Sequence, residues 1–250
     1  MHIQINEGVY DLVLRADVGS TRHFQWFLFR VSHTRAGAAC CFRVVNMEKG
    51  ASLLGSGMQP VLFSRKRFAQ TGVCWTRQGS DVTYCQNTLA FLSDRTNTHA
   101  SFNTASFTLV FEHDDDECFI AYHYPYSYSC MQAYLSAREG HPFLSRSLLC
   151  HTPAGLQCDL LRITGGGRSA SSTLPHIIVS ARVHPGESNA SWVMHGACAC
   201  LRTRACFIIS EYVCFWQVFL TPYWVTHLVR QLSVQTQSFS WCPCLTQTVL

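Results

Sequence analysis

Two residues with metal-binding side chains, His184 and Glu187, stand three positions apart in the stretch "IIVSARVHPGESNASW". An apolar run stops just before them, and Pro185 and Gly186 lie between them. Imidazole and carboxylate groups both bind zinc, and a catalytic zinc takes three protein ligands and a water molecule. A tight turn could bring these two side chains to one ion, which a second histidine would complete. The spacing alone also suits an ordinary surface loop, so both interpretations stay open at this point.

The elements around the turn are expected to place it at the end of a strand. Residues 155–164 and 174–183 are apolar and predict two strands, separated by the flexible sequence "GGGRSASST". The second strand is predicted to be buried and to lead directly into His184. Residues 189–194 then predict a helix entered from the carboxyl end of that strand, where open α/β sheets place their ligands.

The sequence from Tyr10 to about Phe111 has the pattern of short strands separated by glycine-containing turns. Residues 10–18 alternate apolar and polar side chains, and residues 23–32 carry apolar side chains on both faces, as a strand inside a sandwich does. The segments "AACCFRVVN", "VTYCQNTLAF" and "SFTLVFEH" continue the pattern. Helical periodicity is nearly absent, so the region predicts an antiparallel β-sandwich.

Two charged runs are expected to lie in solvent. The basic triplet at residues 65–67 predicts a solvated turn, and the acidic run "EHDDDE" at 112–117 predicts a solvated loop. After the acidic run, Pro125 predicts a chain reversal. Residues 127–139 then predict a helix that is capped by Ser127 or Ser129.

The composition limits the classes of function. Of the 250 residues 48% are hydrophobic and only 14% are charged, against about 25% in typical soluble domains. The net charge of +4 is small and the basic residues are scattered, so nucleic-acid binding is not indicated. The 14 cysteines would suit a secreted protein, but the N-terminus has no secretory signal pattern. A reducing compartment with mostly free thiols is therefore expected.

Several ordered segments together resemble one known family. The stretch "ARVHPGESNASWVMHG" is similar to the zinc-binding segment of the cytosolic carboxypeptidases, a metallocarboxypeptidase family. The segments "YDLVLRADVGSTRHFQWFLFRVS", "RVVNMEKGASLLGSGMQPVLFS", "FEHDDDECFIAYHYPYSYS" and "SLLC" resemble that family's N-terminal β-domain and its entry into the catalytic domain. The resemblance covers residues 8–196, and its specificity comes from the agreement of several segments in order.

The resemblance implies a fold and a site. It implies an antiparallel β-sandwich over residues 1–118, an incomplete α/β zinc carboxypeptidase domain over 119–196, and a divergent apolar, Cys-rich tail over 197–250. By the same resemblance His184 and Glu187 are the first two ligands of one Zn²⁺ ion. The implied activity is removal of C-terminal or side-chain glutamates from tubulin and similar acidic tails, in the cytoplasm and in association with the cytoskeleton.

The remaining parts of the family's site are not found in this sequence. The family needs a second His ligand, an Asn-Arg pair for the substrate carboxylate and a general-base Glu, and the sequence after Gly196 no longer resembles it. His195 and His227 are poor replacements for the ligand, and Arg202 or Arg204 for the carboxylate clamp. Residues 205–229 have about the length of a membrane span, but polar residues interrupt them. A foreign C-terminus without partners for its apolar surface fits better, so the chain is expected to be truncated.

Three functions follow from these expectations. The first is a zinc carboxypeptidase, which in this chain would be weakly active or inactive. The second is a non-catalytic binding module for tubulin or a partner protein. The third is a product that folds poorly and has no function.

Overall fold

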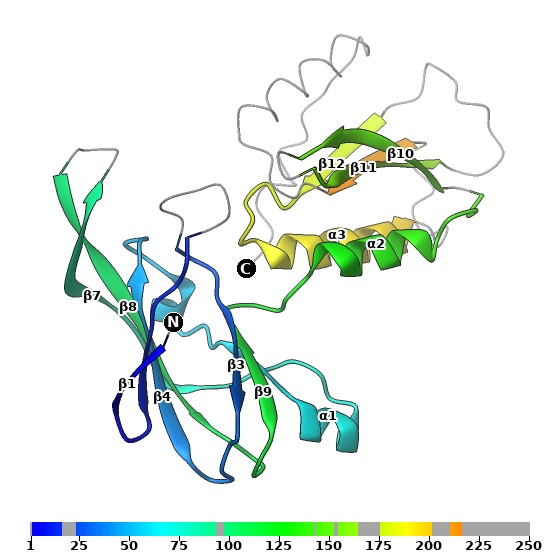
Figure 1. Ribbon diagram of the computed structural model, residues 1–250. Helices are drawn as coiled ribbons and strands as arrows, with labels where there is room; N and C mark the ends of the chain where they lie inside the picture. The colour runs from blue at the N-terminus through cyan, green and yellow to red at the C-terminus, as the bar shows by residue number, and fades with distance from the viewer. Residues whose placement is uncertain are drawn as a thin grey trace. The chain divides into compact units, whose positions relative to one another are not determined.

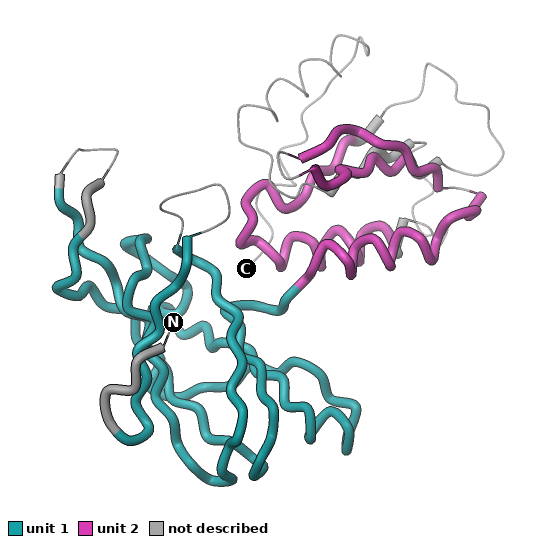
Figure 2. The backbone as a smooth tube through the Cα atoms, in the orientation of Figure 1, with its two compact units in different colours: residues 1–125 teal, residues 126–250 magenta. Residues whose placement is uncertain are grey.

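The computed structural model describes residues 2–16, 24–93, 98–142, 144–152, 155–164, 176–201 and 211–216. The chain divides into two compact units, residues 1–125 and 126–250, which Figure 2 colours separately. Each unit has its own hydrophobic core. The predicted loop at 165–173 lies outside the described residues, as do His227, Arg202 and Arg204.

The first unit is built from two sheets (Figure 1). The five-stranded sheet has the order β1 (His2–Asn6), β2 (Val9–Leu12), β4 (Ala39–Met47), β8 (Thr98–Val110), β7 (Ser80–Ser93). The four-stranded sheet has the order β3 (Leu28–Ser32), β9 (Glu117–Ala121), β5 (Val61–Ser64), β6 (Thr76–Arg77). The described pairs are antiparallel except β2 with β4, which is parallel and departs from the predicted antiparallel sandwich.

Aromatic side chains from the two sheets fill the space between them. Phe29 of β3 lies with its ring centroid 5.3 Å from that of Phe42 on β4, and Phe107 of β8 stacks on Phe27 at 5.9 Å. Phe107 is completely buried, and burial of such a side chain contributes about 1.5–3 kcal/mol. The expectation of two apolar faces in residues 23–32 is wrong for Leu28, which is 48% exposed. Only one face of β3 packs against the core.

Two short helical elements interrupt the strand pattern. A 3₁₀ helix covers Leu53–Ser56, and helix α1 covers Arg65–Thr71, where the sequence predicted a solvated turn. The hydroxyl of Ser64 caps α1 by accepting a hydrogen bond from the amide of Arg67. The helix ends at Gly72, which has the positive φ angle of 72° that glycine adopts without strain.

The acidic run at 112–117 is not uniformly solvated, because Asp116 is only 3% exposed. Its carboxylate accepts four hydrogen bonds: from the Ser64 hydroxyl, the Cys118 thiol and the backbone amides of Lys66 and Glu117. Burial by itself raises the pKa of Asp116, but these hydrogen bonds outweigh it and the pKa lies below its ordinary value. One carboxylate therefore joins the start of α1 to the start of β9.

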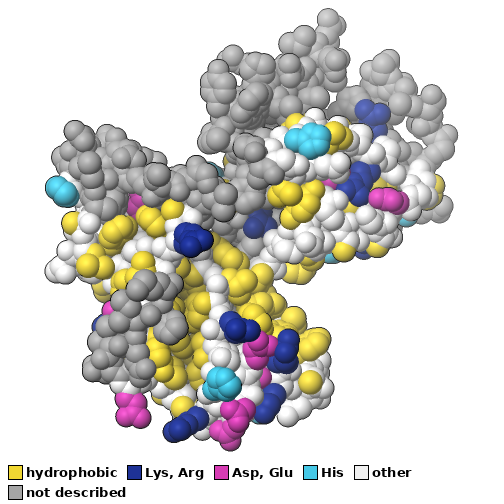
Figure 3. Space-filling view, in the orientation of Figure 1, with side chains coloured by type: hydrophobic (Ala, Val, Ile, Leu, Met, Phe, Trp, Pro, Cys, Tyr) yellow, Lys and Arg dark blue, Asp and Glu magenta, His cyan; other side chains and the backbone are white. Residues whose placement is uncertain are grey.

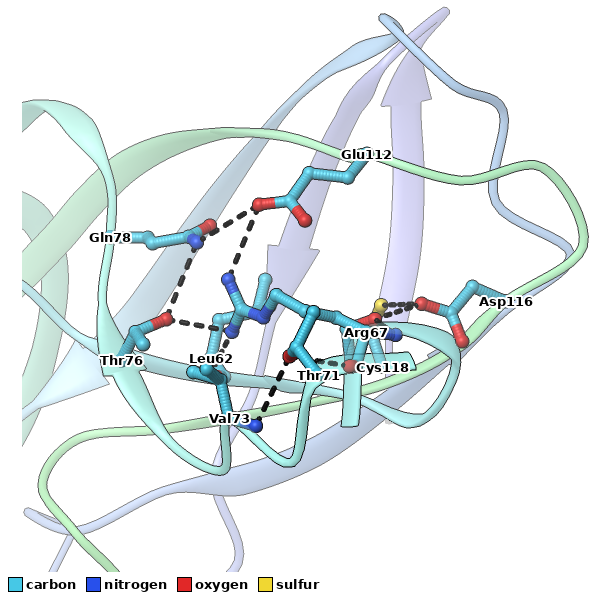
Figure 4. A network of polar contacts seen from close by, with 10 residues as sticks. Leu62, Arg67, Thr71, Val73, Thr76, Gln78, Glu112, Asp116 and Cys118 are labelled. Carbon is cyan, nitrogen blue, oxygen red and sulfur yellow. Dashed lines mark hydrogen bonds and ion pairs between the residues drawn. The ribbon is translucent and has the colours of Figure 1, made fainter. Parts of the chain in front are cut away.

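Arg67 makes a second set of contacts beside this carboxylate (Figure 4). Its side chain is only 11% exposed. The guanidinium donates to Glu112, to the backbone carbonyl of Leu62 and to the hydroxyl of Thr76. The prediction of a solvated basic turn is therefore wrong for Arg67, which connects α1, β5 and β6.

The second unit is a mixed sheet with two helices along one face (Figure 1). The strand order is β10 (Leu144–His151), β11 (Gln157–Thr164), β13 (Glu211–Trp216), β12 (His176–Ala181). Strands β12 and β13 are parallel and the other pairs are antiparallel. The helices are α2 (Tyr128–Ser136) and α3 (Ser188–Leu201). Ser127 caps α2 by accepting from the amide of Cys130, which confirms one of the two predicted caps.

Buried side chains from both helices and from the sheet form the core of this unit. Met131, Tyr134 and Leu135 come from α2, Met194 and Cys198 from α3, and Leu161 and Ile163 from β11. The predicted buried strand at 174–183 is only partly buried, since Ser180 is exposed and Val179 is half-buried. The sheet is thus covered by helices on the face to which Leu161 and Ile163 point.

Strand β13 comes from the part of the sequence that was expected to have no partners. Its backbone pairs on one side with β11 and on the other with β12. The expectation of an unpartnered tail is therefore wrong for Glu211–Trp216. Among the described residues, no helix has the length and apolar character needed to cross a membrane.

A buried carboxylate also organises the second unit. Asp159 on β11 is 3% exposed and binds Arg146 of β10 through both of its oxygens, at 2.9 and 3.1 Å. Gln132 of α2 donates to the same carboxylate at 2.8 Å. Arg146 also contacts Glu139 at 3.0 Å, but that carboxylate is 62% exposed. On the face drawn in Figure 3, charged side chains of both signs are interspersed and the described residues form no basic stripe.

Replacing Asp116 by Asn is expected to lower the free energy of unfolding of the first unit by about 2–3 kcal/mol, because an amide cannot accept all four hydrogen bonds. Stabilisation by the ionised carboxylate is fully present above its ordinary pKa of 3.8 and is lost as the pH falls through the lower folded pKa. Urea denaturation of wild type and D116N between pH 7 and pH 2 measures both effects. The exposed neighbour Asp115 provides the control D115N, and an equal pH dependence in wild type and D116N contradicts the prediction.

Asp159 and Glu139 provide a matched test of the second unit, since Arg146 binds one buried and one exposed carboxylate. Asp159→Asn is expected to cost about 2–3 kcal/mol because it leaves a buried amide beside a largely buried guanidinium that has lost its charged partner. Glu139→Gln is expected to cost less than about 1 kcal/mol because the exposed pair is solvated. Hydrogen–deuterium exchange over residues 144–164 measures the difference. Equal effects of the two substitutions would show that the buried Asp159 is no more important to Arg146 than the exposed Glu139.

Candidate metal centre

The candidate metal residues lie on the connection between β12 and α3. The strand ends at Ala181 and the helix begins at Ser188. Arg182 has a positive φ of 60°, which turns the chain out of the strand direction. The amide of Glu187 donates to the carbonyl of His184 at 3.1 Å, and this hydrogen bond closes the turn around Pro185 and Gly186.

This turn brings the two side chains together. Nδ1 of His184 lies 2.6 Å from Oε1 of Glu187. The side chains are 65% and 47% exposed, so a small ion can reach them from solvent. An exposed pair of this kind contributes little to stability, so the contact is not needed to hold the fold.

The donor atoms suit a zinc ion. Zinc lies about 2.0–2.2 Å from nitrogen and oxygen ligands, which in a tetrahedral site are about 3.3 Å apart. The two atoms are closer than that, at hydrogen-bond distance. A cation bound between them would need their separation to increase by less than about 1 Å, which two exposed side chains can provide by small rotations. The pair therefore fits two positions of a zinc site.

Arg182 fixes the position of the turn. Its Nε donates to the carbonyl of Pro185 at 3.0 Å, and its Nη1 donates to the carbonyl of Tyr126 at 2.6 Å and to the hydroxyl of Ser191 at 3.4 Å. Burial lowers the pKa of the guanidinium from its ordinary value, while interactions with Tyr126 and Glu187 raise that pKa by less. Arg182 thus connects the turn, the start of α3 and Tyr126, which lies two residues before α2.

His195, the nearer of the two poor replacements for the missing ligand, lies elsewhere. Its Nδ1 is 3.1 Å from the hydroxyl of Tyr126, and its ring centroid is 3.6 Å from that of Tyr134. Burial, with a smaller contribution from Arg138, lowers the pKa of this imidazole. Among the described residues, no group of three His, Cys, Asp or Glu side chains could hold a metal ion. The structure brings His184 and Glu187 together but does not add His195 to them.

Sequence reasoning missed the residues that support the turn. The apolar pattern of residues 174–183 predicts only a strand that includes Arg182, although a charged residue at the end of such a strand is a signal of a buried hydrogen-bonding role. Ser188 is fully buried and its hydroxyl oxygen has no hydrogen-bond partner in the described part of the chain. No signal in the sequence distinguishes Ser188 from an ordinary helix-capping serine.

Comparison with known proteins places the chain among carboxypeptidases. Residues 2–123 match the family model "Cytosolic carboxypeptidase N-terminal domain". Cytosolic carboxypeptidase 1 of Mus musculus is 40% identical over 208 residues, which is 78% of this chain and 17% of the relative. Cytosolic carboxypeptidase 4 of Mus musculus is 39% identical over 210 residues, which is 78% of this chain and 18% of the relative. The chain thus spans less than a fifth of the length of these relatives.

Solved structures share the fold. A metallo-carboxypeptidase from Pseudomonas aeruginosa has a TM-score of 0.64 at 20% identity, over 94% of this chain and 63% of that one. A putative carboxypeptidase A from Shewanella denitrificans has a TM-score of 0.62 at 24% identity, over 85% of this chain and 50% of that one. Together with the matched N-terminal domain and the two curated relatives, this likeness leads to one conclusion: the chain belongs to the cytosolic carboxypeptidase family.

Proposed function

We propose that this chain carries part of a zinc carboxypeptidase site, in which His184 and Glu187 are two of the protein ligands of one Zn²⁺ ion. The observation that carries the proposal is the 2.6 Å approach of an exposed imidazole nitrogen to an exposed carboxylate oxygen. Membership of the cytosolic carboxypeptidase family supports it. When bound, the ion supplies a Lewis acid that polarises a carbonyl group and activates water for hydrolysis.

His184 and Glu187 would bind the ion, and Arg182 positions the turn that carries them. The ion would be held by Nδ1 of His184, through its nitrogen lone pair, and by the carboxylate of Glu187, whose oxygen lies close to that nitrogen. Arg182 keeps the turn in place through the carbonyl of Pro185. The side chains of His184 and Glu187 are both exposed, so the site is open to solvent.

The proposed substrate class is an acidic chain end. In this proposal residues 1–118 form the β-sandwich domain, and residues 119–196 form the first part of a zinc carboxypeptidase domain that removes C-terminal or side-chain glutamates from tubulin and similar tails. The proposed location is the cytoplasm, in association with the cytoskeleton. The names of the curated relatives support a cytosolic carboxypeptidase, and the net charge of +4 is compatible with acidic partners.

A non-catalytic binding module is the second candidate. One observation favours it: within the described residues no third metal-binding side chain joins His184 and Glu187. A substrate-binding arginine and a general-base glutamate are likewise not identified there. In that case the first unit and the incomplete second unit would contact tubulin or another partner without cleaving it.

Zinc titration of the full chain by calorimetry tests the proposal directly. We expect wild type to bind Zn²⁺ and the variants H184A and E187Q to lose that binding, because each removes one donor. The variant H151A, which removes an exposed histidine of the same unit, is the control and should bind as wild type does. Equal binding by all four proteins would exclude His184 and Glu187 as ligands.

Two further assays separate the enzyme from the binding module. They are hydrolysis of a polyglutamate peptide with and without chelator, and co-sedimentation with microtubules.

Arg182→Lys is expected to weaken zinc binding by about 10-fold to 100-fold, although Arg182 is not a proposed ligand. Lysine carries one donor nitrogen and cannot reach the carbonyls of Pro185 and Tyr126 together as the guanidinium does. The same titration measures the effect. Arg162→Lys on β11, whose side chain is exposed, is the matched control. An unchanged zinc affinity in R182K would show that the turn does not depend on this guanidinium.

A further inference from the structure

Two cysteines of the second unit lie directly opposite each other on neighbouring strands. Cys150 of β10 is the register partner of Cys158 on β11 in an antiparallel pair. Directly opposite residues in such a pair have Cα atoms roughly 4.5–5.5 Å apart, with side chains on the same face. That separation falls inside the range of about 4.4–6.8 Å that a disulfide requires.

The two thiols differ in accessibility. Cys158 is 1% exposed, whereas Cys150 is half-buried, and neither forms a disulfide in this structure. Burial raises the pKa of Cys158, and a hydrogen bond and the charge interaction with Cys150 add to the effect. Cys158 therefore stays protonated at neutral pH, and Cys150 is the thiol that a reagent in solution can reach.

We propose that Cys150 and Cys158 form a dithiol site that small-molecule disulfides, such as glutathione disulfide, oxidise to an intramolecular disulfide. Cys150, as the thiolate, attacks one sulfur of the reagent and releases one small thiol, which leaves a mixed disulfide on Cys150. The sulfur of Cys158 gives up its proton, attacks the Cys150 sulfur and releases the second small thiol. Two protein thiols are oxidised and one small disulfide is reduced, so the exchange is balanced.

A disulfide between Cys150 and Cys158 would fasten the edge strand β10 to its neighbour β11. Strand β10 pairs only with β11 among the described strands, and its register shifts between Leu148 and Cys150. A bond between Cys150 and Cys158 would fasten the end of β10 beyond this shift. It would close a short loop in which the amide of Thr152 already donates to the carbonyl of Leu156 at 2.8 Å. The strands are thus held together by backbone contacts on both sides of the new bond.

A second pair of cysteines in this chain provides an internal control. Cys40 and Cys41 are consecutive on β4, so their side chains point to opposite faces of the sheet. Cys41 contacts the hydroxyl of Ser106 at 3.5 Å, and Cys40 packs against the core of the first unit. These two thiols are close in sequence but are not placed to form a bond.

Tryptic cleavage sites place the two pairs of cysteines on separate peptides, so their oxidation can be measured independently. Trypsin cleaves after Arg35, Arg43, Arg146 and Arg162, which releases residues 36–43 with Cys40 and Cys41, and residues 147–162 with Cys150 and Cys158. The folded full chain is incubated with glutathione disulfide, free thiols are alkylated, and the peptides are weighed without reduction. We expect residues 147–162 to lose two hydrogen atoms and to escape alkylation, whereas residues 36–43 take up alkylating agent on both cysteines.

Two variants assign the roles of the thiols. In C158S the mixed disulfide cannot be resolved, so residues 147–162 should gain one glutathionyl group on Cys150. In C150S the buried Cys158 should gain none. The proposal is overturned if the wild-type peptide stops at the mixed disulfide, if it stays fully reduced, or if residues 36–43 close to the same extent. The measurement does not depend on metal binding, so its failure would leave the proposed zinc site untouched.

Discussion

The candidate site depends on one guanidinium group, that of Arg182, which binds the turn, the start of α3 and Tyr126, two residues before α2, at the same time. The positive φ of Arg182 turns the chain out of the strand direction. The guanidinium donates three hydrogen bonds that hold the chain in this new direction, which places an imidazole beside a carboxylate. The two residues with metal-binding chemistry are exposed, and the residue that positions them is not.

Buried charged groups that bind several partners occur in both units, although the chain has few charged residues. Only 14% of the residues are charged, yet Asp116, Arg67 and Asp159 are almost completely removed from water. Each binds backbone or side-chain groups from two or more elements. A buried charge with several partners costs more to displace than an exposed pair. Asp116, Arg67 and Asp159 therefore join loops and helices to the sheets.

Much of the architecture could be predicted from local pattern. Alternating and apolar runs predicted the strands β4, β7, β8, β11 and β12, and Ser127 was one of two predicted caps for α2. The predictions that were wrong have a common cause: each depended on a contact with a residue that lies far away in the sequence. Nothing local shows that Asp116 meets Ser64, that β2 pairs in parallel with β4, or that residues 211–216 enter a sheet. At the site, spacing could predict the His184 and Glu187 pair but not its support by Arg182.

The strand order of the second unit has a consequence for how the site is made during synthesis. Among the described strands, β12 reaches the rest of the sheet only through β13, which is translated some thirty residues later. The hairpin of β10 and β11 needs no later residue to form. Strand β12, which leads into the candidate turn, does need β13 for its pairing, so in a nascent chain it joins the sheet after that hairpin, and its contacts have the larger sequence separation.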